Sequence, residues 1–156
     1  MKRLKRYFML LLIILHGGGY RRAEYLKRKN YFNKIGNHCY LQPYNFGTEP
    51  KLISFGDNVH VASNVLFINH DITSFMFSFM DNKKYKQRFG TIEIGDNVFI
   101  GANSTILYDV KIGNNVIIGA GSLVNKDIPN NTIVGGVPCK VIDNFEKYKK
   151  KLEIKE

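Results

Sequence analysis

The chain has 156 residues, enough for one domain, and 44% of them are hydrophobic, which argues against a disordered chain. The formal net charge is +10, and the excess basic residues gather in residues 1–34, in residues 83–88 and near the carboxyl end. Basic ends favour an acidic surface or an anionic ligand as partner. Nucleic acid is not expected, because the sequence contains no recognised nucleic-acid-binding module.

Residues 1–34 form a basic and partly apolar segment in which we expect two helices, over 1–15 and 21–30, separated by a glycine run. Within it, residues 7–15 are apolar but too few to span a membrane, which takes about 20 residues. No small-residue cleavage site follows them, as a signal peptide would require. Two interpretations remain open. The helix packs over the open end of the domain, or it lies in a membrane interface with its basic flanks against the headgroups.

A repeat of six residues dominates the carboxyl-terminal half of the chain. Six aliphatic residues recur at this spacing, and each is followed four positions later by a small or β-branched residue: Ile94/Val98, Ile100/Ser104, Ile106/Val110, Ile112/Val116, Ile118/Ser122 and Val124/Ile128. This period is typical of a parallel β-helix. Three hexads close one coil, so residues 18 positions apart should stack on one another.

We therefore predict an all-β fold, a parallel β-helix over residues 35–142, in which several coils must stack to bury their inner faces. Residues 132–142 are expected to form one last strand-like piece. Residues 143–156 should form a short basic helix and tail.

The repeat is interrupted over residues 45–54 and again over residues 72–90. A loop as long as the second one within a compact repeat is usually functional. Its first half is apolar and aromatic and its second half is basic. We favour packing of the aromatic half on its own wall or on a neighbouring subunit; the alternative is a lid that binds an acceptor.

His70 is the candidate for catalysis, because it lies where the wall ends and the second interruption begins. Its unperturbed pKa suits a general base, although an ordinary surface histidine remains the alternative. Neighbours in a strand point to opposite faces, so Asp71 should point away from the imidazole and cap the loop. A His70–Asp71 dyad is the weaker alternative.

No metal site is expected, because three convergent histidines cannot be assembled from the four in the chain. No glycine-rich phosphate loop is present either. Cys39 and Cys139 lie far apart and match no metal motif. We interpret them as two free thiols in a reducing cytoplasm.

Two stretches resemble known enzymes. Residues 94–142, which end in GVPCKVI, are similar to the carboxyl-terminal half of galactoside and maltose O-acetyltransferases, which are hexapeptide-repeat acyltransferases. Residues 49–71, which end in NHD, resemble enzymes that O-acetylate sugars of surface polysaccharides. The resemblance covers about residues 20–142. It implies a left-handed β-helix and a homotrimer, with acetyl-coenzyme A (acetyl-CoA) in the groove between adjacent prisms.

Carried over residue by residue, the resemblance implies that His70 is the catalytic base. It assigns Asn45 to the acceptor pocket, and we assign Asp71 to acceptor binding as well. Ala102 stands where the family often has serine, and Lys140 stands where an Arg or Lys meets the phosphates of the coenzyme. The residues assigned to coenzyme binding are Gly101, Ala102, Ala120, Asn125, Lys126 and Lys140.

The sequence thus predicts an acetyl-CoA-dependent O-acetyltransferase that acts on a sugar hydroxyl by direct transfer, in surface polysaccharide biosynthesis. Two alternatives stay open: an amino-sugar N-acetyltransferase, and a non-catalytic β-helix scaffold at the membrane surface. We expect the protein in the cytoplasm, and peripheral contact of residues 1–15 with the inner face of the membrane is the open alternative.

Overall fold

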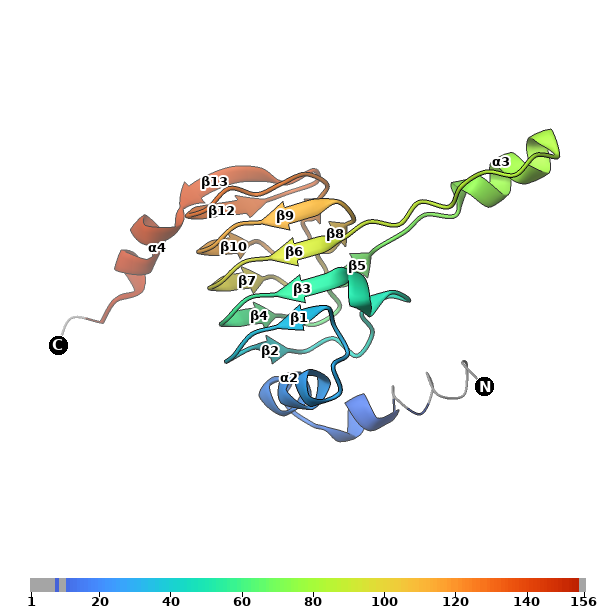
Figure 1. Cartoon of the computed structure of the whole chain (residues 1–156). Helices are drawn as coiled ribbons and strands as arrows, with labels where there is room; N and C mark the ends of the chain where they lie inside the picture. Colours follow the sequence, from blue (N-terminus) through green and yellow to red (C-terminus); the bar gives the residue numbers. More distant parts are fainter. Residues whose placement is uncertain (1–7, 9–10, 155–156) are drawn as a thin grey trace.

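The computed structural model describes residue 8 and residues 11–154. Its body is a three-sided prism whose walls are three sheets, which we call faces A, B and C (Figure 1). Face A holds β1 (Lys34–Ile35), β3 (Ile53–Phe55), β6 (Ile92–Ile94) and β9 (Val110–Ile112). Face B holds β2 (Tyr40–Leu41), β4 (Val59–Val61), β7 (Val98–Ile100), β10 (Val116–Ile118), β12 (Thr132–Gly135) and β13 (Lys140–Asn144). Face C holds β5 (Leu66–Ile68), β8 (Thr105–Leu107) and β11 (Leu123–Val124).

The predicted stacking of successive coils is confirmed. Neighbouring strands of the repeat are parallel, and they pair Ile94 with Ile112, Ile100 with Ile118 and Ile106 with Val124. All the repeat residues at both predicted inward positions are buried. The chain therefore winds from face A to B to C and back to A, and the core is the stack of inward ladders along the prism.

Asparagine ladders build the edge between faces A and B. Asn58, Asn97, Asn115 and Asn131 all have positive φ angles of 55–59°, a conformation that asparagine tolerates better than most residues. Each side-chain amide donates to the next asparagine along the prism at 2.8–2.9 Å. The residue before each asparagine accepts a backbone N–H from the coil below, as Asn114 does from Asp96 at 2.8 Å. The turns and the stacking are thus held by the same residues.

Helix α2 (Gly19–Arg28) covers the open end of the first coil. Its Arg22 is 3% exposed and donates to the carbonyls of Leu41 and Gln42 at 2.7 and 2.6 Å, which satisfies polar groups at the end of β2. Helix α2 therefore packs over the open end of the domain, and Ile13 of the apolar run is buried in the same core.

The predicted helix over 1–15 is only partly described, because residues 1–7 and 9–10 lie outside the described residues. Residues 11–15 are helical. Apart from Ile13, the apolar side chains of this stretch include four that are exposed: Phe8, Leu11, Ile14 and Leu15. Within the described part of the chain, no helix is long and apolar enough to cross a membrane.

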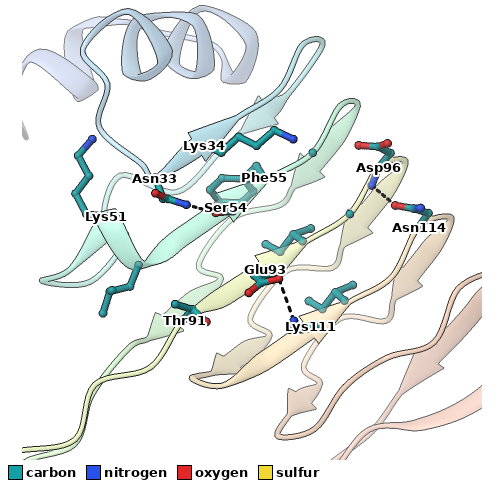
Figure 2. Close-up of a pocket in the computed structure, with 15 residues that line it drawn as sticks. Asn33, Lys34, Lys51, Ser54, Phe55, Thr91, Glu93, Asp96, Lys111 and Asn114 are labelled. Carbon is teal, nitrogen blue, oxygen red and sulfur yellow. Dashed lines mark hydrogen bonds and ion pairs between the residues drawn. The ribbon is translucent and has the colours of Figure 1, made fainter.

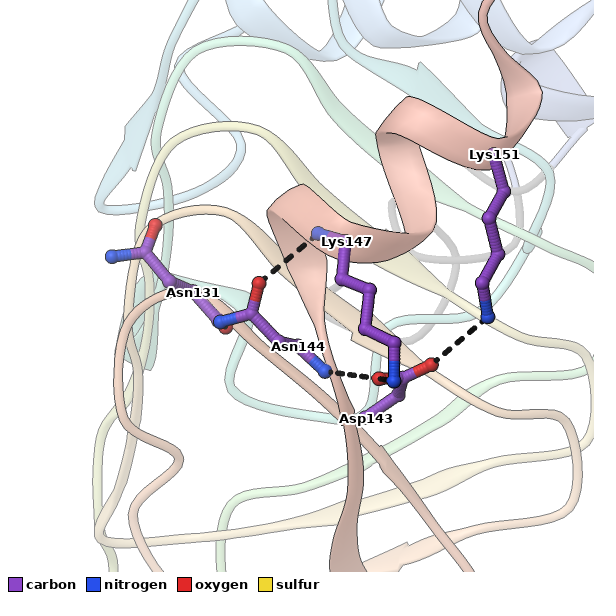
Figure 3. A network of polar contacts seen from close by, with 5 residues as sticks. All are labelled: Asn131, Asp143, Asn144, Lys147 and Lys151. Atoms are coloured by element: carbon purple, nitrogen blue, oxygen red, sulfur yellow. Dashed lines mark hydrogen bonds and ion pairs between the residues drawn. The ribbon is translucent and has the colours of Figure 1, made fainter.

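The carboxyl end corrects one prediction. Residues 132–142 form two strands rather than one piece, because the chain turns at residues 136–139 and β13 pairs antiparallel with β12. The short basic helix is confirmed as α4 (Phe145–Leu152), which begins where the Asn144 side chain accepts from the N–H of Lys147. Asp143 pairs with Lys147 and Lys151 at 3.6 Å each, so this network anchors α4 to the last strand (Figure 3).

The two interruptions of the repeat differ in shape. The first is compact and holds a 3-10 turn, η1 (Pro50–Leu52). The second, which we call the arm (residues 72–90), contains helix α3 (Thr73–Asp81) and projects away from the prism (Figure 1). Packing of its aromatic half on its own wall is therefore wrong. His70 and Phe89 form an antiparallel bridge. The segments that join α3 to this bridge, which we call the stem, carry the helix beyond the wall (Figure 1).

Candidate active site

His70 follows β5 at the edge between faces C and A, which we call edge CA. Phe67 points into the core, the Asn69 side chain is 1% exposed, and His70 is half-buried. The backbone bridge to Phe89 ties His70 to the stem of the arm, and the two rings lie 5.7 Å apart. The structure therefore places His70 on a rigid wall at the base of a projecting element, as the sequence predicts.

Glu49 is the partner of His70, and sequence reasoning missed it. Its Oε2 lies 2.8 Å from Nδ1 of His70, and both side chains are roughly one quarter exposed (29% and 27%). The Thr48 hydroxyl donates to the same carboxylate and lies 3.4 Å from Nδ1. A carboxylate at Nδ1 favours the tautomer with its proton there, which leaves the Nε2 lone pair free to accept a proton.

A short segment brings Glu49 to His70. The Asn45 side chain accepts from the N–H of Gly47 at 3.1 Å, and Gly47 has a φ of +79°. A Cβ at Gly47 would lie 2.9 Å from the carbonyl oxygen of Phe67, so only glycine lets the segment pass this close to β5. The signal in the sequence was a carboxylate about one coil before His70, hidden because the repeat is interrupted there.

Asn69 lies beneath this segment. Among the described residues, neither atom of its side-chain amide has a hydrogen-bond partner, although both are buried. Its Oδ1 would be 3.1 Å from a Cβ at Gly47. Buried amides are normally paired, so the unpaired amide of Asn69 at the base of the candidate site costs folding free energy.

The Asn45 side chain, predicted to bind the acceptor, accepts from the N–H of Gly47 on the same segment. It lines a hollow of about 260 Å³ together with Tyr44, Asn64 and Leu66. The structure thus places Asn45 on the segment that carries Glu49.

Asp71 caps the base of the arm. It accepts from the backbone and hydroxyl of Thr73 at 3.1 and 2.6 Å and from the Tyr108 hydroxyl at 2.8 Å. The hydrogen bonds from Thr73, and then that from Tyr108, lower the pKa of the Asp71 carboxyl. Its bonds therefore fit the predicted cap, and the dyad partner of His70 is Glu49 rather than Asp71.

Arg88 also lies at the base of the arm, on the segment that returns from α3 to the prism. Its guanidinium donates to Asp109 at 3.1 Å and lies over the Tyr108 ring at 4.8 Å. We call Asp71, Arg88, Tyr108 and Asp109 the clamp. It joins both ends of the arm to the coil above His70.

The residues assigned to coenzyme binding fall on two different edges. Ala102 and Ala120 lie one coil apart at the edge between faces B and C, which we call edge BC. Among the described residues, their backbone N–H groups have no hydrogen-bond partner. Gly101 packs against the Ala120 backbone, where an added Cβ would lie 2.5 Å from the Ala120 nitrogen. Lys140 is exposed, and it lies opposite Gly135 in the pairing of β13 with β12, at the side of face B that borders edge BC.

Asn125 and Lys126 follow β11 at edge CA, on the side of His70. Both are exposed. Burial raises the pKa of the Cys139 thiol, and the charge of Lys126 opposes this rise. The N–H of Cys139 donates to the carbonyl of Leu123 in β11 at 2.9 Å, so the turn before Lys140 lies beside face C. Cys139 and Cys39 are both buried free thiols, as predicted.

Other parts of the described chain offer less for catalysis. No three His, Cys, Asp or Glu side chains converge among the described residues as a metal site would require. A depression of about 710 Å³ lies on the outer side of face A (Figure 2). It is lined by polar residues such as Lys34, Ser54 and the Glu93–Lys111 pair, and by none of the predicted site residues.

Comparison with known proteins identifies relatives of the chain. The family model described as bacterial transferase hexapeptide (six repeats) matches residues 91–126. Protein CapG of Staphylococcus aureus is 48% identical over 124 residues, which cover 76% of this chain and 70% of CapG. Galactoside O-acetyltransferase of Lactococcus lactis is 34% identical over 133 residues, which cover 72% of this chain and 63% of that enzyme. The chain thus spans less than two thirds of the galactoside enzyme.

Among solved structures, the galactoside acetyltransferase in complex with coenzyme A superposes with a TM-score of 0.69 at 27% identity. The superposition covers 99% of this chain and 86% of that chain. The prism, its helical amino-terminal end and its carboxyl-terminal hairpin therefore have a counterpart of known structure.

Proposed function

The chain belongs to the hexapeptide-repeat acetyltransferase family, and from that premise we propose that it transfers an acetyl group from acetyl-CoA to a sugar hydroxyl. The observation that carries the proposal is the 2.8 Å contact between Glu49 and His70 at the edge of the prism. It supplies an oriented base where an acceptor can reach it.

In the proposed reaction, Nε2 of His70 takes the proton from the acceptor hydroxyl as the acceptor oxygen attacks the thioester carbonyl. Glu49 keeps the Nδ1 proton in place and stabilises the imidazolium that forms. His70 then returns the proton to the departing sulfur, so atoms and charge balance without an acyl-enzyme. Much of the rate comes from holding the two substrates together.

Acetyl-CoA fits the chemistry of edge BC. Its pantetheine arm carries amide carbonyls, and the backbone N–H groups of Ala102 and Ala120 are free to donate to them. Its phosphates are anionic, and two exposed cations lie near this end of the prism, Lys140 on β13 and Lys126 at edge CA. The solved complex of a relative with coenzyme A supports this assignment.

We also propose a homotrimer in which each active site is shared. His70 lies at edge CA and Ala120 at edge BC, so in one chain face C separates them. A head-to-tail arrangement of prisms would bring edge CA of one copy to edge BC of the next, and a threefold rotation closes this arrangement into a ring. Most outward residues of face C are apolar, including Leu66 and Ile68, which are 55% and 37% exposed. The left-handed sense of the coil is part of the same proposal.

A sugar of a surface polysaccharide is the proposed acceptor, supported by the O-acetyltransferase activity in the name of the galactoside relative. Reaction in the cytoplasm, with residues 1–15 at the inner face of the membrane, is the corresponding location. Its support is the outward exposure of Phe8, Leu11 and Leu15.

The test is acetyl transfer from acetyl-CoA to a panel of sugars, amino sugars and lipid-linked sugars. We expect His70→Ala to lower kcat by about 10²–10⁴-fold, which is the contribution of a general base. Acetyl-CoA should still raise the melting temperature of this variant, because ligand binding stabilises the native state. His38→Asn is the matched control, since His38 has a positive φ that asparagine tolerates.

Near-normal turnover by His70→Ala would show that His70 is not the general base. Transfer to amino groups alone would make the enzyme an N-acetyltransferase. Absence of any thermal shift with acetyl-CoA in the unaltered protein would favour the scaffold.

A further inference from the structure

Helix α3 exposes a concentration of large apolar side chains at the end of the arm, away from the prism (Figure 1). Phe79 and Met80 are 89% and 70% exposed. The exposed apolar residues of this region are Ile72, Phe75, Met76, Phe77, Phe79 and Met80. Single apolar residues on a surface need no explanation, but a contiguous apolar patch marks an interaction site.

The arrangement of these side chains limits what could cover them. At 100° per residue they span an arc of about 200° of the helix, opposite a narrow seam formed by Ser74, Ser78 and Asp81. A helix that packs on a protein wall typically buries a stripe of little more than about 100°. A membrane interface, in contrast, covers about half of a helix that lies in its plane.

The charges that follow α3 complement an anionic surface. Lys83, Lys84 and Lys86 are all exposed, and none of them forms an ion pair with another described residue. An apolar helix flanked by lysines is the composition of a helix that binds membrane surfaces. Its apolar side chains enter the boundary between headgroups and acyl chains, and its cations meet the phosphates of anionic lipids.

The clamp fixes the orientation of the arm relative to the prism. Tyr108 holds Asp71 at one end of the arm, and Asp109 holds Arg88 at the other. Both ends lie next to His70, because His70 and Phe89 form a backbone bridge. Docking of α3 on a surface would therefore orient edge CA, with His70, relative to that surface.

We propose that helix α3 and the lysines that follow it, as far as Lys86, dock on an anionic lipid bilayer. The apolar arc of α3 lies in the interface, and Lys83, Lys84 and Lys86 lie among the headgroups. The binding itself is independent of catalysis. Its consequence rests on the proposed function: a sugar acceptor joined to a lipid would be presented to His70 at the membrane surface.

The test is co-sedimentation of the full-length protein with vesicles of phosphatidylcholine, alone or mixed with phosphatidylglycerol. The unaltered protein should partition onto the mixed vesicles. Phe79→Ser/Met80→Ser should weaken this partition at least about tenfold, because two buried apolar side chains are lost. Lys83→Gln/Lys84→Gln/Lys86→Gln should weaken it about 10²-fold at low salt, at about one kcal/mol per lysine.

Matched controls come from α4, which projects on the opposite side of the prism (Figure 1). Leu152 and Ile154 are 65% and 89% exposed, so Leu152→Ser/Ile154→Ser matches the apolar variant. Lys149→Gln/Lys150→Gln/Lys151→Gln matches the change in charge. Both controls should bind mixed vesicles as the unaltered protein does, and the arm variants should keep its melting temperature.

Unchanged vesicle binding by both arm variants would overturn the proposal, as would equal partition onto phosphatidylcholine alone. Loss of the oligomer by Phe79→Ser/Met80→Ser in analytical ultracentrifugation, with vesicle binding intact, would also overturn it and assign α3 to a second copy. His70→Ala should bind vesicles normally, so failure of the transferase proposal and failure of the docking proposal give different results.

Discussion

The imidazole of His70 and the carboxylate of Glu49 come from different coils, and their 2.8 Å contact orients the imidazole as the proposed base requires. A histidine alone can hold either tautomer, and only one of them leaves Nε2 able to accept a proton from an acceptor. The carboxylate selects that tautomer. Glu49 is thus a positioning residue, and its effect should appear in turnover rather than in binding.

We expect Glu49→Gln to lower kcat by about 10–10³-fold, because the neutral amide selects the tautomer poorly and does not stabilise the imidazolium. The KM for acetyl-CoA should stay near that of the unaltered enzyme, because Glu49 is not among the groups assigned to the coenzyme. Steady-state kinetics across pH measures both, with exposed Glu153→Gln as control. A rise in KM with unchanged kcat would contradict this role.

Gly47→Ala should disturb the segment that carries Glu49. The residue has a φ of +79°, and an added Cβ would lie 2.9 Å from the Phe67 carbonyl oxygen. We expect a loss of about 1–2 kcal/mol in unfolding free energy from the left-handed backbone alone. The kcat should fall as well, because Glu49 moves away from His70.

The matched control is Gly17→Ala, since nothing lies within 4 Å of a Cβ at Gly17. Chemical denaturation and steady-state kinetics measure the two effects. Equal stability and turnover of the two variants would mean that the segment adjusts without strain.

At the scale of elements, the asparagine ladder holds the coils in register at the edge between faces A and B. Asn115 accepts from Asn97 at 2.9 Å, donates to Asn131 at 2.8 Å and has a φ of 55°. Asn115→Ala should lose about 2–3 kcal/mol of unfolding free energy, from two hydrogen bonds and left-handed strain. Asn115→Gly loses the bonds but not the conformation, so it should be the milder variant in chemical denaturation. The reverse order would refute this account.

The clamp at the base of the arm should respond to acid. Hydrogen bonds from Thr73 and Tyr108 lower the folded pKa of Asp71 below the ordinary value of an aspartate. A depressed pKa adds stability that is present above the unfolded value and is lost as pH falls through the folded value. The clamp should therefore hold at neutral pH and loosen only below about pH 4.

Tyr108→Phe removes one of the bonds that lower this pKa, so the Asp71 pKa should rise toward its ordinary value. Loosening of the arm should then begin at a higher pH. Carboxyl NMR titration measures the pKa, and amide hydrogen exchange of residues 72–90 measures the loosening. Tyr85→Phe is the control, because the Tyr85 hydroxyl bonds Asp81 within the arm. An unchanged Asp71 titration would show that Tyr108 has no part in it.

At the scale of the whole molecule, His70 and Ala120 lie on opposite edges of face C within one chain, which is the basis of the proposed shared site. We expect trimers made only of His70→Ala chains to be inactive. Trimers made only of a variant that blocks edge BC, such as Ala120→Trp, should be inactive as well. Mixed trimers should then regain activity, because some sites combine an intact His70 with an intact Ala120 of the neighbour. Random mixing of equal amounts gives about one quarter of full activity, since both halves must be intact by chance.

Co-refolding or co-expression of the two variants, followed by an acetyl transfer assay, measures this recovery. Refolding each variant alone is the control for residual activity. No recovery from the mixture would place the whole site within one chain.

The sequence predicted the prism well because a ladder is a local property that repeats. Each aliphatic residue must stack on its counterpart 18 positions away, so one period determines strand, wall and core together. His70 was found in the same way, as the last residue before the pattern stops. Glu49, the two strands of residues 132–144 and the helix in the arm were missed, because each lies where the period is interrupted.

Taken alone, the amino-acid sequence determined the inward ladders, the prism and the position of His70 at its edge, because short-range periodicity and burial suffice for these. Only the tertiary structure decided that Glu49 meets His70, that the arm projects from a clamp, and that Ala120 and His70 lie on different edges. These facts depend on contacts between coils at interruptions, where no repeat constrains the path of the chain. There the path follows from close approach at Gly47 and from side-chain bonds such as that of Asp71 with Tyr108.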